Sequence, residues 1–238
     1  MVGTATRPAP VVVPVRDARL LDRFIRLPWK IYAEDPVWVP PLLSDVRKVL
    51  SRSHPFHQHA DVEYFLAVRG TEAVGRIAAI VNHAYNEFHE DRTGFVGLFE
   101  CEDDPEVAGL LLDTATDWLR QRGRSEAIGP FNLSSNDELY SPGILLDGFE
   151  HPPVLLMAHN RPYYARLFEE AGWTKAKDLL AYWTDWLEPP ERFVRALKRM
   201  SRSMTGLAIR SMDLRRLDQE VELVKEIYNA AWEKNWGF

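Results

Sequence analysis

The chain has 238 residues, of which 46% are hydrophobic and 27% are charged, so its length and composition suit one large folded domain or somewhat more. The formal net charge of −6 provides no broad basic field for nucleic acid, and no apolar run approaches the roughly 20 residues of a membrane-spanning helix. The single cysteine, Cys101, excludes an intramolecular disulfide and suits a reducing compartment.

In chain order, residues 1–10 come first and lack the apolar centre of a signal peptide. We expect a flexible N-terminal arm and a cytoplasmic protein, with neither nucleic acid nor a membrane as partner. Val11–Val15 is a β-branched run typical of a strand, and Asp17 can cap the helix that follows. We expect Pro28 to bend or break that helix. The next expected elements are a short helix at Leu42–Leu50 and strands at Glu63–Arg69, Val74–Asn82 and Gly94–Cys101.

The second half of the chain predicts a helix, a strand and then a long loop. Asp103–Gly123 has an acidic start, an apolar face and a Gly stop, which together indicate a long helix. A strand at Ala127–Phe131 leads into a polar, Gly/Pro-rich loop over residues 132–153. The remaining expected elements are a short strand at Val154–Ala158, a helix at Pro162–Ala171 and a final strand at Leu179–Trp186. Hairpins combined with crossover helices predict an α/β fold, a mixed central sheet with helices on both faces.

The C-terminal segment repeats the start of the chain. Leu21-Asp22 is followed nine residues after the Asp by Ile31-Tyr32, and Leu217-Asp218 is followed at the same spacing by Ile227-Tyr228. The alternative is a plain C-terminal helix that packs on the first domain; we favour a repeat because the order of strand and helix also matches. The predicted division is a domain over 11–187, a connecting helix over 188–205, and the first strand and helix of a truncated second domain over 206–238.

The order of elements resembles that of the GNAT superfamily of acyl-CoA-dependent acyltransferases. One segment that carries the resemblance is Gly94–Gly123, a strand, a tight loop and a helix with the pair Leu111-Leu112. The other is Asn160–Trp173, N-R-P-Y-Y-A-R-L-F-E-E-A-G-W, which is similar to the family's N-x-x-A-x-x-L-Y-x-x-x-G-F. More narrowly, the chain resembles tandem, poorly characterised members. The resemblance covers about Val11 to Trp186 and implies a GNAT-like acyl-CoA N-acyltransferase fold.

The family's cofactor loop is altered in this chain. In the family, the pyrophosphate binds to backbone N–H groups of a Q/R-x-x-G-x-G/A loop at a helix N-terminus. Aligning the Leu pair puts Asp103 at the first position, Glu106 at the first glycine and Ala108 at the last, so only Ala108 fits. Carboxylates here stabilise the helix and repel a polyanion, unless a divalent metal bridges them to a phosphate. The resemblance still implies acyl-CoA or acetyl-CoA as donor, held by Phe99, Cys101, Val107, Ala108, Gly109 and Asn160.

The family's usual general acid, the tyrosine of the L-Y pair, is replaced by Phe168, which cannot donate a proton. Tyr163 and Tyr164 lie close by, and we expect the helical spacing to point both of them to other faces of the helix than Phe168. A packing role for both tyrosines is the alternative. A carboxylate near the end of the fourth strand often serves as the base in such enzymes. The candidate catalytic residues are therefore Glu100, Glu102 and Tyr164.

The loop over residues 132–153 leaves the sheet where the GNAT fold splays open and binds its ligands. Its short polar side chains could contact a substrate or simply cap the loop through Asx turns. The candidate substrate-binding residues are Asn132, Asn136, Asp137 and Tyr140. A second polar cluster, at His54, His57, His59 and Asp61, suits zinc or nickel by its residue types. Solvated loop histidines are the favoured interpretation, so we predict no metal.

Two main hypotheses follow. The first is an N-acyltransferase-like protein that moves an acyl group from acyl-CoA to an amine of unknown identity, with this domain impaired in CoA binding. The second is a non-catalytic GNAT-fold domain that binds a small molecule or supports its tandem partner domain. The expected partners are a small-molecule substrate and a C-terminal domain beyond Phe238. A metal-dependent nucleotide hydrolase, with the acidic cluster holding Mg²⁺, is a third alternative.

Overall fold

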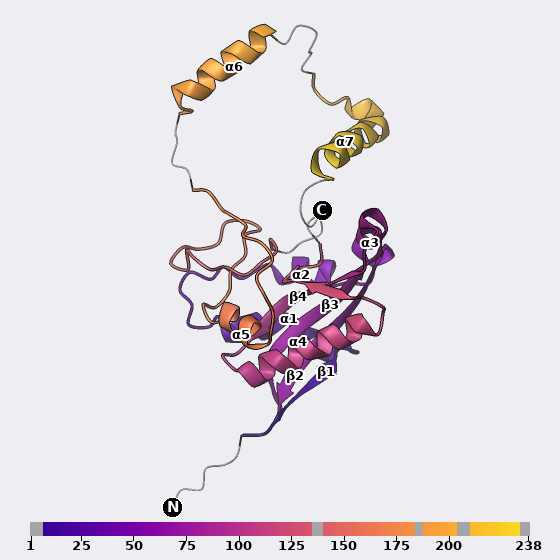
Figure 1. Ribbon diagram of the computed structural model, residues 1–238, viewed down its shortest axis with the longest axis vertical. Helices are drawn as coiled ribbons and strands as arrows, with labels where there is room; N and C mark the ends of the chain where they lie inside the picture. The colour runs from indigo at the N-terminus through magenta and orange to yellow at the C-terminus, as the bar shows by residue number, and fades with distance from the viewer. Residues whose placement is uncertain (1–6, 135–139, 184–187, 204–209, 234–238) are drawn as a thin grey trace, which may run out of the picture. The chain divides into compact units, whose positions relative to one another are not determined.

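The computed structural model describes residues 7–134, 140–183, 188–203 and 210–233 (Figure 1). The chain divides into two compact units, with the change from the first to the second between Lys177 and Asp178. Among the described residues, no helix is long and apolar enough to cross a membrane.

The first unit is built on a five-stranded sheet in the order β1-β2-β3-β4-β5. Neighbouring strands from β1 to β4 are antiparallel, whereas β5 is parallel to β4. The strands are β1 (Pro10–Pro14), β2 (Ala60–Arg69), β3 (Glu72–Asn82), β4 (Thr93–Cys101) and β5 (Glu126–Ile128). The helices of this unit are α1 (Ala18–Ile31), α2 (Leu43–Val49), the 3₁₀ turn η1 (Pro55–Gln58), α3 (His83–His89), α4 (Pro105–Arg120) and α5 (Tyr164–Glu170).

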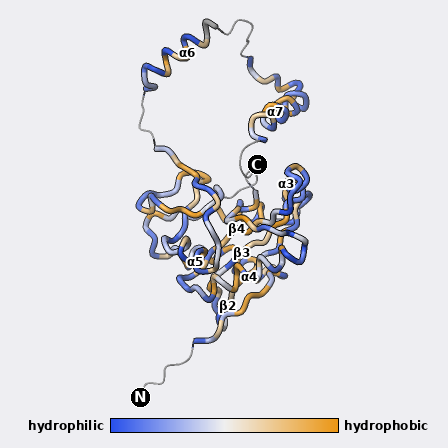
Figure 2. The backbone as a smooth tube through the Cα atoms, in the orientation of Figure 1, coloured by the Kyte–Doolittle hydropathy of each residue, from blue (hydrophilic) through white to orange (hydrophobic). Residues whose placement is uncertain are grey.

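Both faces of the sheet are covered, because successive side chains of a strand point to opposite faces. Along β3, Ile77 and Ala79 are buried with residues of α4 and α5, while Ala78 and Ile80 are buried with residues of α1 and α2. Figure 2 shows hydrophobic residues along the central strands β3 and β4. The predicted α/β fold, a mixed central sheet with helices on both faces, is therefore confirmed.

Helix α1 begins as predicted and continues through its proline. The side chain of Asp17 accepts a hydrogen bond from the N–H of Leu20 at 2.8 Å. Pro28 lies inside the helix, which runs on to Ile31, so the predicted break is wrong. A proline leaves the carbonyl four residues earlier without its helical donor; here the Arg76 guanidinium donates to that carbonyl, of Phe24, at 2.8 Å. Arg76 thus replaces the missing amide and helps the helix to tolerate Pro28.

Strands β4 and β5 separate soon after they pair. The parallel register joins only Thr93–Phe95 to Glu126–Ile128, so the strand predicted to reach Phe131 is shorter. Beyond it, the chain crosses β4: the N–H of Phe131 donates to the carbonyl of Val96 at 2.7 Å, and a side chain added at Gly97 would overlap the carbonyl of Phe131. The ladder between β3 and β4 shifts register at this place. The gap between β4 and β5 is therefore closed by the chain itself.

Three other expectations need correction. Val154–Ala158 forms no strand, and neither do residues 179–183, while residues 184–186 lie outside the described ranges. Leu155 and Leu180 are among the exposed side chains of these segments, so their apolar composition reflects no place in the sheet. Between β3 and β4, where the sequence suggests only a turn, α3 forms with Asn82 as its N-cap.

The second unit contains α6 (Glu191–Ser203), the 3₁₀ turn η2 (Leu214–Arg216) and α7 (Leu217–Trp232). Helices are thus present in both C-terminal segments for which they are predicted. The strand predicted at Gly206–Ser211 falls mostly on residues 204–209, outside the described ranges, and residues 210–211 form none. The division of the chain into a complete and a truncated domain stays a prediction.

Candidate active site

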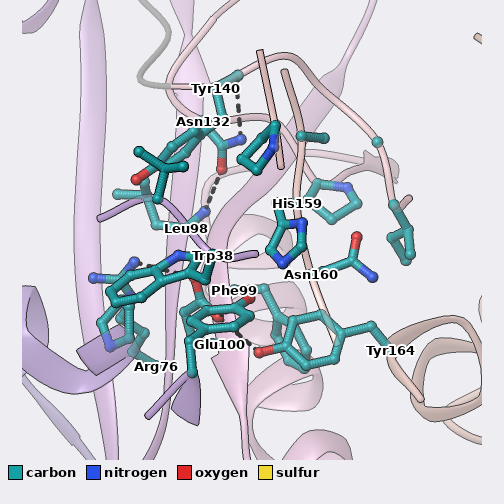
Figure 3. A pocket seen from close by; sticks show the side chains of 18 residues that line it. Trp38, Arg76, Leu98, Phe99, Glu100, Asn132, Tyr140, His159, Asn160 and Tyr164 are labelled. Atoms are coloured by element: carbon teal, nitrogen blue, oxygen red, sulfur yellow. Dashed lines mark hydrogen bonds and ion pairs between the residues drawn. The ribbon is translucent and has the colours of Figure 1, made fainter. Parts of the chain in front are cut away.

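A pocket lies at the C-terminal half of β4, bordered by the end of α1, the start of α5 and the loop residues 130–132, 140–144 and 153–160 (Figure 3). Its volume of about 50 Å³ has room for a few water molecules rather than for a substrate. The polar side chains that line it are Tyr32, Arg76, Glu100, Asn132, Tyr140, His159, Asn160 and Tyr164.

Glu100 is the centre of a buried polar cluster. One carboxylate oxygen, Oε2, accepts hydrogen bonds from the hydroxyls of Tyr32 at 2.8 Å and Tyr164 at 2.7 Å. The other, Oε1, lies 3.5 Å from Nη2 of Arg76. Burial raises the pKa of Glu100, and the cation of Arg76 and the two hydroxyls oppose that rise. Two hydrogen bonds to Oε2 and one ion pair at Oε1 therefore hold this carboxylate inside the protein.

Tyr164 connects this cluster to β4 and α5. Its hydroxyl donates to Glu100 and also accepts from the N–H of Cys101 at 3.0 Å. Burial and the neighbouring Glu100 raise the pKa of Tyr164, so the hydroxyl stays neutral. Its ring and that of Phe168 both contact Phe99, with centroid distances of 5.3 and 4.8 Å. The expectation that Tyr164 and Phe168 lie on different faces is wrong, since residues four apart share one face of a helix.

A second polar pair, Asp35 and His159, contributes its histidine to the lining of the same pocket. Nε2 of His159 lies 3.0 Å from a carboxylate oxygen of Asp35, and the same oxygen lies 3.4 Å from Nη1 of Arg161. The histidine side chain is only 5% exposed. Its other nitrogen, Nδ1, has no hydrogen-bond partner among the described residues. Burial acts to raise the pKa of Asp35, but the hydrogen bonds from His159 and the N–H of Val37 outweigh it, so the pKa is lowered.

Arg76 and two aromatic residues that follow α1, Tyr32 and Trp38, complete the pocket. Nε of Arg76 is buried and has no partner among the described residues, although its other nitrogens bind Phe24 and Glu100. Trp38 stacks on the ring of Tyr32 with centroids 5.0 Å apart and forms part of the lining. Two side chains that line the pocket, Arg76 and His159, therefore each have one buried nitrogen without a hydrogen-bond partner among the described residues.

Sequence reasoning missed Asp35, His159, Tyr32 and Arg76. Asp35 and His159 are 124 residues apart, and no spacing pattern links them. The only local signal was the polar run His159-Asn160-Arg161 ahead of α5, in which the sequence singled out Asn160 alone.

The structure brings together six of the residues proposed from the sequence. Those that line the pocket are Phe99, Glu100, Asn132, Tyr140, Asn160 and Tyr164. The amides of Asn132 and Asn160 hold the loops: Asn132 accepts from the N–H of Leu98 at 3.0 Å, and Asn160 accepts from the N–H of Leu145 at 2.6 Å. Burial raises the pKa of Tyr140 to about 12. Asn136 and Asp137 lie outside the described residues.

The remaining candidates do not line the pocket. Cys101 is fully buried, and its carbonyl accepts from the hydroxyl of Tyr163 at 2.8 Å. Val107 and Ala108 are fully buried under the sheet, while Gly109 has open space around it. Glu102 pairs with Nζ of Lys30 at 2.9 Å.

The N-terminus of α4, where the resemblance places the cofactor pyrophosphate, is occupied by the chain's own groups. Asp104 accepts from the N–H groups of Glu106 at 3.0 Å and Val107 at 3.4 Å, and it pairs with Arg69 at 2.6 Å. Asp103 pairs with Arg166. Asp103 and Asp104 are thus paired with cations from other elements, and the amides of Glu106 and Val107 are already bonded.

No group of three or more histidine, cysteine, aspartate or glutamate side chains in the described ranges is arranged to hold a metal ion. In the histidine-rich segment, Asp61 instead pairs with His83 at 3.0 Å.

Comparison with known proteins gives long matches but no family model. No protein-family model matches the chain. The bacterial ceramide synthase of Caulobacter vibrioides is 44% identical over 230 residues, which cover 95% of this chain and 59% of that protein. Protein YghO of Escherichia coli is 35% identical over 219 residues, or 92% of this chain and 55% of that protein. The chain thus spans somewhat over half the length of these curated relatives.

Among solved structures, the matches are more distant. An aminoglycoside acetyltransferase from an uncultured soil metagenomic sample, in complex with sisomicin, is 11% identical with a TM-score of 0.43, and the match covers 76% of this chain and 97% of that one. A structure of the same acetyltransferase in complex with trehalose is 12% identical with a TM-score of 0.44.

Proposed function

We propose that this chain belongs to an N-acyltransferase that moves a fatty acyl group from acyl-CoA to the amine of a long-chain base. A relative that is 44% identical over nearly the whole chain carries the name ceramide synthase, and a ceramide is a long-chain base acylated on its nitrogen. The observation that carries the proposal is the pocket at β4. It combines a buried carboxylate, neutral tyrosine hydroxyls and unpaired polar atoms, as acyl transfer requires.

The groups at the end of β4 suit the polarisation of a thioester. Negative charge develops on the carbonyl oxygen when the amine attacks, and a donor already in place stabilises it. The N–H at Nε of Arg76, buried without a partner among the described residues, is such a donor. Glu100 and Tyr164 remain the candidate catalytic-site residues from the sequence, whereas Glu102, outside the pocket, is the weaker candidate.

We further propose that this domain binds the CoA pyrophosphate poorly. A phosphate at the start of α4 would have to displace Asp104 from two amides and from Arg69. Part of the relatives lies outside the matched region, and we propose that a tandem domain supplies phosphate contacts there. The occupied α4 terminus also favours the second candidate function, a non-catalytic domain that supports its partner.

The test is an assay of the full-length protein with long-chain acyl-CoA and a long-chain base, with the N-acyl product identified by mass spectrometry. We expect the amide product, and a lower rate with acetyl-CoA. Calorimetric titration of both donors, with and without Mg²⁺, separates the candidates. Binding of a ligand without any amide product would favour the non-catalytic function, and release of the acyl group only to water would contradict both.

A further inference from the structure

We propose that His159, oriented by Asp35, is the general base that takes the proton of the acceptor amine, and that Glu100 is a positioning residue. The inference rests on the proposed acyl transfer and assigns the proton acceptor within the same pocket. The sequence pointed to Glu100 or Glu102 for this role, so the inference replaces that assignment.

The tautomer of His159 follows from its partner. An ionised carboxylate only accepts hydrogen bonds, so the nitrogen that faces Asp35 at 3.0 Å, Nε2, carries the proton. The other nitrogen, Nδ1, then presents a lone pair. It belongs to a side chain that is 5% exposed and lines the pocket (Figure 3), and no described residue donates to it. Buried polar atoms are rarely left unpaired, and an exception in a pocket indicates a place for a ligand atom.

Glu100 is the weaker candidate for the proton acceptor, because its carboxylate is already the anionic partner of two hydroxyls and a buried cation. Oε2 receives two tyrosine hydroxyls, at 2.8 and 2.7 Å, and Oε1 faces Arg76 at 3.5 Å. Protonation would remove the negative charge that these three donors share and would leave the buried cation without its partner. The tyrosines and Arg76 are therefore held in place by Glu100, which acts on the reaction through them.

Asp35 has a defined part in the same step. Its carboxylate holds the imidazole ring in one orientation and stabilises the imidazolium that forms when Nδ1 takes a proton. Arg161, 3.4 Å from the same oxygen, limits the negative charge there in the resting state. The other groups close to the ring are Tyr32, whose ring centroid lies 5.7 Å away, and the more distant carboxylate of Glu100.

The amine, the thioester and His159 account for every proton and electron pair in the reaction. The nitrogen of the acceptor amine forms a bond to the thioester carbonyl carbon, and the carbonyl electron pair moves onto oxygen. His159 Nδ1 takes the proton from that nitrogen. When the carbonyl re-forms, the carbon–sulfur bond breaks, and the departing thiolate takes the proton from the imidazolium. The products are an amide and the free thiol of CoA, with His159 neutral again.

The experiment compares His159→Gln and His159→Ala with the full-length wild-type protein, using a long-chain acyl-CoA and a long-chain amine. Gln retains an N–H for Asp35 but cannot take a proton. It therefore distinguishes the loss of the general base from the loss of the hydrogen bond to Asp35. We expect kcat to fall about 10²- to 10⁴-fold in both variants, with KM for the acyl-CoA little changed. His151→Ala is the matched control, because that histidine is 73% exposed and outside the pocket.

Two readouts would not respond to a merely structural histidine. Added imidazole should restore part of the activity of His159→Ala. A weakly basic amine should be acylated by His159→Gln with a smaller loss, because its nitrogen gives up the proton more readily once it has bonded to the carbonyl carbon. If His159→Gln keeps the kcat of the wild type while Glu100→Gln loses activity, the inference is overturned and the proposed function still stands. A wild-type protein that forms no amide would overturn the proposed function, and the inference with it.

Discussion

Two polar regions lie near the end of β4, the N-terminus of α4 and the pocket, and they differ in how completely their groups are paired. At α4, Asp104 bonds two amides and Arg69, and Glu102 pairs with Lys30. In the pocket, Nδ1 of His159 and Nε of Arg76 are buried without partners among the described residues. At α4, Nη1 of Arg69 also lacks a hydrogen-bond partner, but it lies 3.9 Å from a carboxylate oxygen of Glu102. The two unpaired atoms of the other region belong to side chains that line the pocket, which makes the pocket the better candidate for chemistry.

The largest expected effect comes from a substitution that breaks the buried polar cluster around Glu100. Glu100→Gln should lower the free energy of unfolding by about 3–5 kcal/mol, because it leaves the buried cation of Arg76 without its counter-charge. Denaturant unfolding monitored by circular dichroism measures the change. The matched control is Glu102→Gln at the α4 region, where a partly exposed ion pair is worth about 1 kcal/mol or less. Equal losses in the two variants would contradict the distinction between the regions.

The next effect tests the crossing of β4 that forms the pocket wall. Gly97→Ala should destabilise the protein by about 1–3 kcal/mol, because its new methyl group would overlap the carbonyl of Phe131. Gly109→Ala is the control: it lies in the interior of α4 with open space, so alanine should stabilise by about 0.5–1 kcal/mol. A thermal melt of the two variants gives opposite shifts. A neutral Gly97→Ala would show that the chain does not cross β4 here.

A smaller effect concerns the cap of α4. Asp104→Ala removes an acceptor for two amides and should cost about 1 kcal/mol, as typical N-cap losses do. It also removes the carboxylate that pairs with Arg69, but Glu102, 3.9 Å from the same guanidinium, still provides a counter-charge. Asp104→Asn keeps a capping oxygen and should lose less. If this cap also blocks phosphate, calorimetry should show tighter binding of acyl-CoA to Asp104→Asn than to the wild type. Unchanged or weaker binding would contradict the proposal that Asp104 competes with the pyrophosphate.

The smallest effect is a change in pH dependence. Burial acts to raise the pKa of Asp104, but the hydrogen bonds from Arg69 and the Val107 amide outweigh it and lower the pKa below its ordinary value of 3.8. A carboxyl group with a lowered pKa in the folded state contributes stability above its unfolded pKa, and this is lost as the pH falls through the folded pKa. As the pH falls from about 5 to 2, the free energy of unfolding should therefore decrease less for Asp104→Asn than for the wild type. Identical slopes would show that this carboxyl is not coupled to folding.

Prediction from the sequence worked best where the signal is local. The strand predicted at Val74–Asn82 and the cap at Asp17 are confirmed, since each depends on residues adjacent along the chain. The predicted strand at Val154–Ala158 is wrong, because apolar residues alone do not supply a hydrogen-bonding neighbour. The predicted break at Pro28 is wrong, because Arg76 of β3 donates to the Phe24 carbonyl that the proline leaves without an amide donor. This donor is distant along the chain.

By itself, the sequence determined the fold class, most of the helices and strands, and the presence of a carboxylate and a tyrosine near the end of the fourth strand. Periodicity and capping are short-range, so they can be seen without coordinates. Only the tertiary structure decided which polar groups satisfy one another. It brought Asp35 to His159 across 124 residues and paired the acidic residues of α4 with distant cations. Such pairing depends on the packing of whole elements, and no pattern along the chain encodes it.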